Sequence, residues 1–172
     1  LLAKSNCAQI LIGFETANKD GLKGIDKGNW KHKQFDNYLK AIDKIQSYGI
    51  SVNGCFILGF DTDTKETFKE TEQFIIDSNL SEVQITVLTP FPGTELYNQL
   101  KREGRLLTDN YWNKCTLFDV NFIPKNFSVM ELETEFENLM ENVYSKQLVS
   151  DRKKHFKKTL LNRRKTNLYE SI

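Results

Sequence analysis

Hydrophobic residues in the first hundred positions form short apolar runs separated by amphipathic stretches. Three runs have the length of a buried strand, at 8–15, 50–60 and 81–90. The second run, "ISVNGCFILGF", is rich in β-branched and aromatic residues, which favour strands. Between the runs, apolar residues recur at helical spacing from Phe35 to Ile45 and again after Asp63. This alternation predicts parallel βαβ units with right-handed crossovers.

Glycines and capping residues mark the ends of the expected helices. Gly49 ends the first helix, and Asp63 with Glu66 three residues later has the form of a capping pair for the second. A third helix opens at Gly93-Thr94 and closes at Gly104. Residues 1–104 therefore read strand, loop, helix, strand, helix, strand, helix.

The pattern changes after residue 104. The stretch "YWNKCTLFDVNFIPKNF" is irregular and aromatic, and Ser128 with Glu131 forms a second capping box. The helix behind this box has one apolar stripe: Leu132, Phe136, Leu139 and Val143. A further, basic helix is expected over 151–165. We divide the chain into an α/β part, 1–104, and an irregular segment with a helical C-terminal extension, 105–172.

Length and composition describe an ordinary globular domain. The chain has 172 residues, 39% hydrophobic and 27% charged. No apolar run approaches the roughly 20 residues that span a bilayer, and the opening lacks the features of a secretory signal. The three cysteines, Cys7, Cys55 and Cys115, are too far apart for a disulfide framework, a zinc site or a cluster site. They are expected as buried small hydrophobes in a reducing, cytoplasmic setting.

The net charge of +1 hides an asymmetry between the tail and the rest of the chain. Residues 151–172 carry a net charge of +6, and residues 1–150 carry −5. Such a tail can contact nucleic acid or anionic lipid, but it has only Phe156 and Tyr169 as stacking aromatics. A solvated helix face is the favoured interpretation, without a nucleic-acid partner. His32 and His155 have no partner at metal-ligand spacing and receive no role.

A parallel sheet of only three strands leaves two unprotected edges, which proteins usually avoid. The chain also begins with Leu1 rather than Met. Both observations predict that the chain is a piece of a larger barrel or sheet. On its own, such a piece is expected to self-associate through its strand edges.

Polar or glycine-containing turns follow each of the three strands: Gly13-Phe14-Glu15, Gly59-Phe60-Asp61 and Thr89-Pro90. In parallel α/β folds this edge binds ligands. Glu15 can accept hydrogen bonds from a ribose or an ammonium group, or it is an exposed loop acid. Gly59 allows a ligand close to the backbone, or it serves an ordinary strand-to-helix turn.

Together, "IGFET", "GISVNGCFILGFDTDT" and "VLTPFPGTELYNQLKREGRL" resemble the second half of the radical S-adenosylmethionine (SAM) fold. The similar subgroup usually carries a cobalamin-binding domain, and it also shows a downstream Trp, here Trp112, and a "VNFIP"-like stretch, here 120–124. The resemblance covers residues 10–150. It implies half of a partial (βα)6 TIM-like barrel with strands four to six, followed by the helical extension.

The resemblance also implies a set of cofactor-binding residues. In that family the fourth strand contacts the ribose and methionyl part of SAM, which points to Glu15 and Thr16. The fifth carries a Gly-x-Ile-x-Gly pattern beside the adenine, matched here by Ile57 and Gly59, with Cys55 in place of the first glycine. Backbone at the end of the sixth strand completes the adenine site at two residues, Leu88 and Thr89.

The family's Cys-x-x-x-Cys-x-x-Cys loop, which holds a [4Fe–4S] cluster, does not occur in this sequence. The resemblance therefore implies a parent enzyme that cleaves SAM reductively for radical methylation or rearrangement. Its implied cofactors are SAM and the cluster, with cobalamin as a further candidate. This piece alone is expected to be catalytically inactive. Two alternatives stay open: a piece of a methylthiotransferase-like enzyme that modifies transfer RNA, and a non-catalytic, oligomeric half-barrel scaffold.

Overall fold

The computed structural model describes residues 1–108 and 112–169 and, within these, side chains up to residue 163. A parallel sheet of three strands lies at its centre, in the order β1 (Gln9–Glu15), β2 (Ser51–Leu58) and β3 (Glu82–Val87). α1 (Trp30–Gln34) and α2 (Tyr38–Ser47) connect β1 to β2, and α3 (Lys65–Ser78) connects β2 to β3. This confirms the predicted α/β fold class, with the strands and crossovers of half a barrel.

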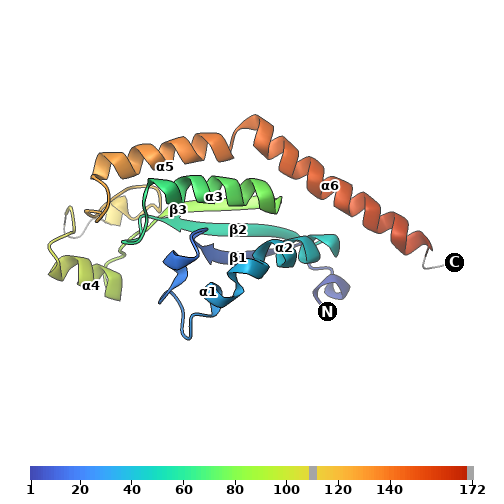
Figure 1. The fold of residues 1–172 in the computed structure, drawn as a ribbon, viewed down its shortest axis with the longest axis horizontal. Coiled ribbons are helices and arrows are strands. Elements are labelled where there is room, and N and C mark those ends of the chain that lie inside the picture. The colour runs from blue at the N-terminus through green and yellow to red at the C-terminus, as the bar shows by residue number, and fades with distance from the viewer. Residues whose placement is uncertain (109–111, 170–172) are drawn as a thin grey trace.

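Three further helices follow the sheet in the described chain and pack on the elements before them. α4 (Glu95–Arg102) follows β3, and the described residues after it, 105–108 and 112–169, are called the extension, which contains α5 (Val129–Val143) and α6 (Lys146–Tyr169). Figure 1 shows α5 running alongside α3, with α6 turning away from it toward the C-terminus. Four single 3-10 turns complete the described elements: Leu2–Ser5, Asp20–Leu22, Phe35–Asn37 and Trp112–Lys114.

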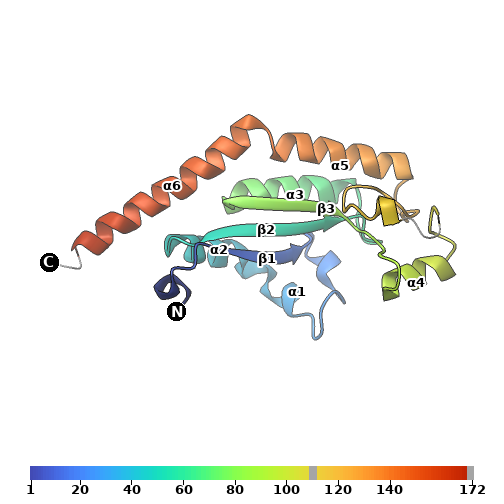
Figure 2. The same cartoon turned by 180° about the vertical axis from the view of Figure 1, so that it is seen from behind.

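The two faces of the sheet differ in burial. Along β2, the side of Val52, Phe56 and Leu58 is fully buried, whereas the alternate positions from Ser51 to Ile57 are half-buried. α2 and α3 lie in front of the sheet in Figure 1 and behind it in Figure 2. One face therefore packs on helices, and the other is open in the described chain.

An aromatic cluster fills the space between the sheet and its helices. The Phe14 ring lies 4.9 Å from Tyr38 and 5.6 Å from Phe56, and Phe74 of α3 lies 5.7 Å from both phenylalanines. Such pairs add about 1 kcal/mol each beyond the area that they bury. The cluster fixes the C-terminal end of β1 against α2 and α3.

The start of α3 differs from the prediction. The N-cap residue is Thr64, and Thr67 completes the capping box by accepting the Thr64 N–H at 3.1 Å. The predicted pair of Asp63 and Glu66 is therefore wrong. Asp63 lies one residue too early and is fully buried, so its carboxylate turns back toward the end of β2.

The extension agrees with its sequence pattern. Ser128 and Glu131 form the predicted capping box at the start of α5, and the four residues of the predicted stripe are all buried. α6 begins earlier than predicted, at Lys146, and its Arg152 donates to the Val143 carbonyl at 2.9 Å. Against expectation, the three cysteines are half-buried rather than buried. None of the three forms a disulfide.

The two edges of the sheet are unequal, which corrects the prediction of two unprotected edges. At β3, the Val87 N–H donates to the Leu117 carbonyl at 2.7 Å, and the Tyr144 hydroxyl donates to the Val83 carbonyl at 2.7 Å. At β1, no segment of the described chain pairs with the outer edge, and Leu11 is 64% exposed. The extension thus closes the sheet at β3 only.

Candidate functional site

The C-terminal ends of the three strands meet at one edge of the sheet. Glu15 of β1 is in register with Phe56 of β2, next to Ile57. Past the strand ends, the Leu88 N–H donates to the Leu58 carbonyl at 2.8 Å, beside Gly59. The structure therefore brings the predicted residues of the three strands together at this edge.

Glu15 is a partly buried, ion-paired carboxylate. Its side chain is 22% exposed and accepts a hydrogen bond from Lys31 of α1, and its φ of 69° lies in the left-handed region. The Tyr38 hydroxyl donates to the Lys31 carbonyl at 3.1 Å, and burial raises the pKa of Tyr38 to about 12. Glu15 is thus not the exposed loop acid of the alternative interpretation. Lys31 was missed, because nothing distinguishes it within a lysine-rich stretch.

The two predicted threonines are buried and close their own turns. Thr16 Oγ1 accepts the Asn18 N–H at 3.1 Å, and the Thr89 hydroxyl donates to the Val87 carbonyl at 3.0 Å. These bonds fix the backbone that follows β1 and β3. The threonines therefore shape the edge through the main chain.

The turn after β2 explains both Gly59 and Asp63. Gly59 has a φ of +103°, and a Cβ there would lie 3.2 Å from Phe122 and 3.3 Å from Leu132, both in the segment after α4. Asp63 Oδ2 accepts the Gly59 N–H at 2.8 Å and the Phe60 N–H at 3.0 Å. Burial raises the pKa of Asp63 to about 6, and its Oδ1 has no hydrogen-bond partner. The glycine is thus required by the turn and by the extension.

Asp61 lies on the outer side of the same turn. Arg105 binds its carboxylate through two hydrogen bonds, of 3.0 and 2.6 Å, and Lys125 lies 2.7 Å away. The hydrogen bond from Arg105 is the main cause of the lowered pKa of Asp61. Sequence reasoning missed this cluster, because Arg105 lies 44 positions from Asp61 and no local pattern links them.

The open face of the sheet carries polar side chains below this edge. Asn53 Oδ1 is buried without a hydrogen-bond partner, and the Cys55 thiol donates to Gln84 Oε1 at 3.8 Å. Burial, with a smaller contribution from Glu15, raises the pKa of Cys55, which disfavours the thiolate. In a closed barrel this face would line the interior.

A small hollow of about 150 Å³ opens at the edge itself, between the ends of β2 and β3 and the start of the extension. Its lining is largely apolar, with an ion pair at one side: Phe60, Asp61, Leu88, Leu96, Gln99, Leu100, Arg105 and Phe122. The hollow is smaller than most small-molecule sites, which measure about 300–1,000 Å³, so it could take only part of a ligand. Of the predicted site residues, Leu88 lines it directly.

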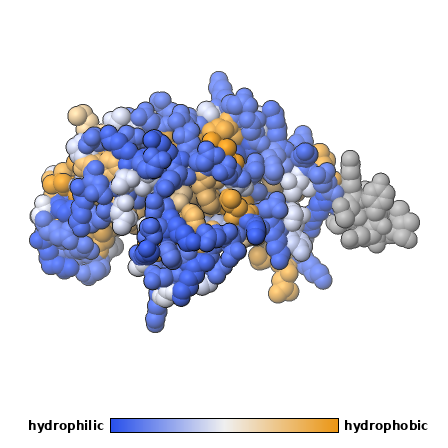
Figure 3. Space-filling view, in the orientation of Figure 1, coloured by the Kyte–Doolittle hydropathy of each residue, from blue (hydrophilic) through white to orange (hydrophobic). Residues whose placement is uncertain are grey.

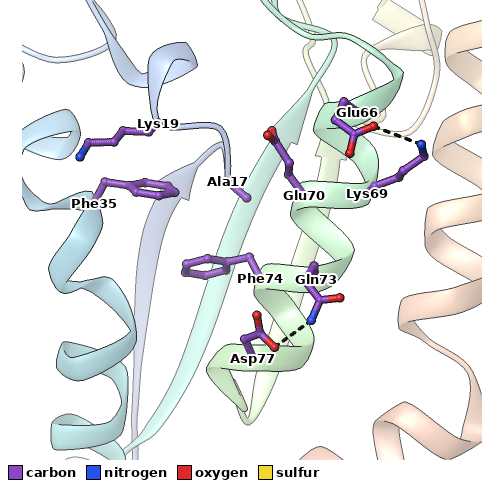
Figure 4. A pocket seen from close by; sticks show the side chains of 9 residues that line it. All are labelled: Ala17, Lys19, Phe35, Glu66, Lys69, Glu70, Gln73, Phe74 and Asp77. Atoms are coloured by element: carbon purple, nitrogen blue, oxygen red, sulfur yellow. Dashed lines mark hydrogen bonds and ion pairs between the residues drawn. The ribbon is translucent and has the colours of Figure 1, made fainter.

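A larger groove, of about 580 Å³, lies on the helical side of the sheet, between the Ala17–Lys19 stretch, Phe35 and α3. Figure 3 shows it as a hollow with hydrophobic surface inside a hydrophilic rim. Several rim side chains bind one another, as Figure 4 shows for Glu66 with Lys69, 3.1 Å, and Gln73 with Asp77, 2.8 Å. None of the predicted site residues lines this groove, so the edge of the sheet is the better candidate.

The described residues contain no group of three His, Cys, Asp or Glu side chains that could hold a metal ion. A [4Fe–4S] cluster therefore does not fit the part of the chain that the structure describes. Within the same residues, no helix is long and apolar enough to cross a membrane.

The chain is similar in sequence to one family of domains and to several curated proteins. Residues 94–171 match a family described as a domain of unknown function, DUF4070. The chain is 31% identical over 152 residues to bacteriochlorophyllide d C-12(1)-methyltransferase of Chlorobaculum tepidum, covering 88% of this chain and 32% of that protein. It is 37% identical over 110 residues to hopanoid C-2 methylase of Rhodopseudomonas palustris, covering 64% and 20%.

A third relative is named as a methylthiotransferase, from Methanocaldococcus jannaschii. It is 32% identical over 87 residues, which cover 51% of this chain and 18% of that protein. The chain thus spans a third or less of the length of these three curated relatives.

Proposed function

The chain belongs to the cobalamin-type radical SAM family, and from this premise we propose that it supplies the ribose and adenine side of the SAM site in a radical methyltransferase. The observation that carries the proposal is the meeting of Glu15, Ile57, Gly59 and Leu88 at one edge of the sheet. These residues come from three separate strands, yet the fold makes them neighbours. That is the arrangement expected of a site at the carboxyl edge of parallel strands.

Each strand end has a distinct task in this proposal. Glu15 accepts hydrogen bonds from the ribose hydroxyls or the ammonium group of SAM, and Thr16 holds the chain behind it. Lys31, which pairs with Glu15, lies where it can interact with the carboxylate of the same ligand. The adenine lies against Ile57 and the backbone at Gly59, Leu88 and Thr89, next to the apolar hollow.

The parent enzyme requires parts that lie outside this chain. A [4Fe–4S] cluster, whose ligands would come from the rest of the parent, would supply the electron for cleavage of SAM, and cobalamin as a methyl carrier belongs to the same proposal. The remainder of the parent barrel pairs with the open edge of β1, and in its absence that edge supports self-association. We propose a cytoplasmic setting, in keeping with three cysteines that form no disulfide.

Methyl transfer is favoured over the two alternatives. The relatives named for methyl transfer align over 88% and 64% of the chain, and the one named for methylthio transfer over 51%. A transfer-RNA substrate would be favoured by steeply salt-dependent RNA binding through α6. A non-catalytic scaffold would be favoured by a stable dimer without affinity for SAM.

The test uses the full-length parent protein with its cluster reconstituted. We expect production of 5′-deoxyadenosine from SAM under reducing conditions. Glu15→Gln should weaken SAM binding about tenfold, because a charged acceptor of ligand hydrogen bonds becomes neutral. Glu82→Gln is the matched control, since Glu82 is an exposed carboxylate on β3, at the other end of the sheet. Equal SAM affinity in both variants would refute the assignment of Glu15.

A further inference from the structure

The segment after α4 binds the outer side of the β2–α3 turn through charged side chains. Arg105 binds Asp61 in bidentate geometry, and Lys125 Nζ lies 2.7 Å from the same carboxylate. The Arg105 side chain is only 12% exposed and also binds Glu103 at 2.9 Å. A bidentate arginine–carboxylate pair that is largely shielded from water is directional as well as strong.

Backbone contacts fix the position of the same turn. Asn126 Nδ2 donates to two carbonyls of the turn, that of Asp61 at 3.0 Å and that of Asp63 at 2.9 Å. Arg105 also donates through Nε to the Ile123 carbonyl at 2.7 Å, and the Ile123 N–H donates back to the Arg105 carbonyl at 2.7 Å. Arg105 therefore also joins the two ends of the segment that contacts the turn, from residue 105 to residue 123.

Apolar contacts close the inner side. Phe122 and Leu132 are fully buried and fill the space in which a side chain at Gly59 would lie. Phe127 packs edge-on against Phe68 of α3, with ring centres 5.8 Å apart. The segment thus holds the turn by charge on one side and by close packing on the other.

We propose that residues 105–108 and 112–132 of the extension, within the DUF4070 segment, are a brace that holds the β2–α3 turn in its SAM-binding form. Asp61 and Arg105 are its positioning residues. The inference rests on the proposed function, because the braced turn begins with Gly59 of the proposed adenine site. It assigns to this part of the extension a task at the cofactor site: docking of the brace and binding of SAM stabilise each other.

The coupling must be reciprocal. If a docked brace raises the affinity for SAM, bound SAM must stabilise the docked brace by the same factor. SAM should therefore slow hydrogen exchange at amides within the brace that do not touch it. The Leu107 and Ile123 amides are suitable reporters, because they are bonded to the Asn121 and Arg105 carbonyls. A purely structural role of the ion pair would not produce this ligand-dependent protection.

The experiment measures hydrogen exchange and SAM affinity in the full-length parent protein, with and without SAM. In the wild type, we expect SAM to slow exchange at Leu107 and Ile123. In Asp61→Asn this protection should disappear, and the dissociation constant for SAM should rise about tenfold, within the usual range of coupling between sites. Arg105→Lys, which keeps the charge but loses the bidentate geometry, gives a second measurement if Asp61→Asn does not fold.

Arg102→Gln is the matched control, because it removes an arginine of the exposed pair with Glu95, 3.0 Å, in the neighbouring α4. It should behave as the wild type. The inference is overturned if SAM binds without protecting the brace, or if both brace variants keep SAM affinity within about twofold of the control. A wild type that binds no SAM would instead refute the proposed function, and the brace with it.

Discussion

Asp61 and Asp63 lie two positions apart on one turn, yet their surroundings shift the pKa values of the two carboxyl groups in opposite directions. Asp61, on the outer side, is paired with Arg105 and Lys125, which lowers its pKa. Asp63, on the inner side, is fully buried, accepts two backbone N–H groups and has its pKa raised to about 6. One carboxylate is stabilised by its charge, and the other is held in place despite its charge.

The difference shows how the extension and the sheet share this turn. On the inner side, Asp63 binds the backbone of its own turn, and Phe122 and Leu132 of the extension pack against the turn. On the outer side, the turn is bound to the extension by charge, through Asp61. Substitutions on the two sides should therefore differ in size, in pH dependence and in their effect on the extension.

Gly59 should give the largest effect, because it is confined from both directions. Gly59→Ala places a side chain at a φ of +103° and against Phe122 and Leu132. Backbone strain and overpacking together should cost about 4 kcal/mol of the free energy of unfolding. Urea denaturation measures it. A loss below about 1 kcal/mol would mean that the extension does not pack on the turn.

Asp63→Asn should change the pH dependence of stability. The folded-state pKa of Asp63, about 6, lies above its usual 3.8, so its favourable contribution is full below 3.8 and is lost as the pH rises through about 6. An amide does not titrate. The free energy of unfolding of the wild type, relative to Asp63→Asn, should therefore fall by about 2 kcal/mol between pH 4 and pH 7. If the difference in unfolding free energy between the two proteins did not change with pH, the Asp63 carboxyl group would be solvated as in the unfolded chain.

Asp61→Asn should show the opposite sign. Because the pKa of Asp61 is lowered in the folded state, its contribution is present above 3.8 and is lost as the pH falls through the folded-state pKa. We expect a loss of about 1 kcal/mol at pH 7 that shrinks on acidification, reduced from the value of a buried pair because Asp61 is 33% exposed. Parallel urea titrations of the two variants would show whether their pH trends diverge.

Lys125→Gln should have the smallest effect. Its side chain is 53% exposed, and Arg105 still neutralises Asp61 in its absence. We expect a loss of about 0.3 kcal/mol, which decreases further in high salt. A loss as large as that of Asp61→Asn would show that Lys125, and not Arg105, is the main partner that stabilises the Asp61 carboxylate.

Features encoded within a few positions were predictable from the sequence. The three strands, the Ser128–Glu131 capping box and the buried stripe of α5 follow from local periodicity and capping chemistry. Asp63 was misassigned because Thr64, which also suits an N-cap, follows it directly, and Thr67 stands three positions further on to complete the capping box. Burial decided between them, and burial is not a local property.

The partners of the turn could not be predicted. Arg105 lies 44 positions from Asp61, and Asn126 lies 63 positions from Asp63, so only the folded chain brings them together. The cover of the β3 edge has the same origin, since Leu117 and Tyr144 come from the irregular segment and the end of α5. That the predicted residues would meet at one edge could be foreseen, because all parallel strands of a sheet end at the same edge. The distant residues that hold the turn at this edge could not be foreseen.

The most direct test of the central claim is photolabelling of the full-length protein with an azido-adenine analogue of SAM, followed by peptide mapping. The account predicts label in peptides that contain 57–60 or 88–96, at the ends of β2 and β3, and competition by unmodified SAM. Competed label confined to the groove around Phe35 and Phe74, or to peptides outside both regions, would contradict it.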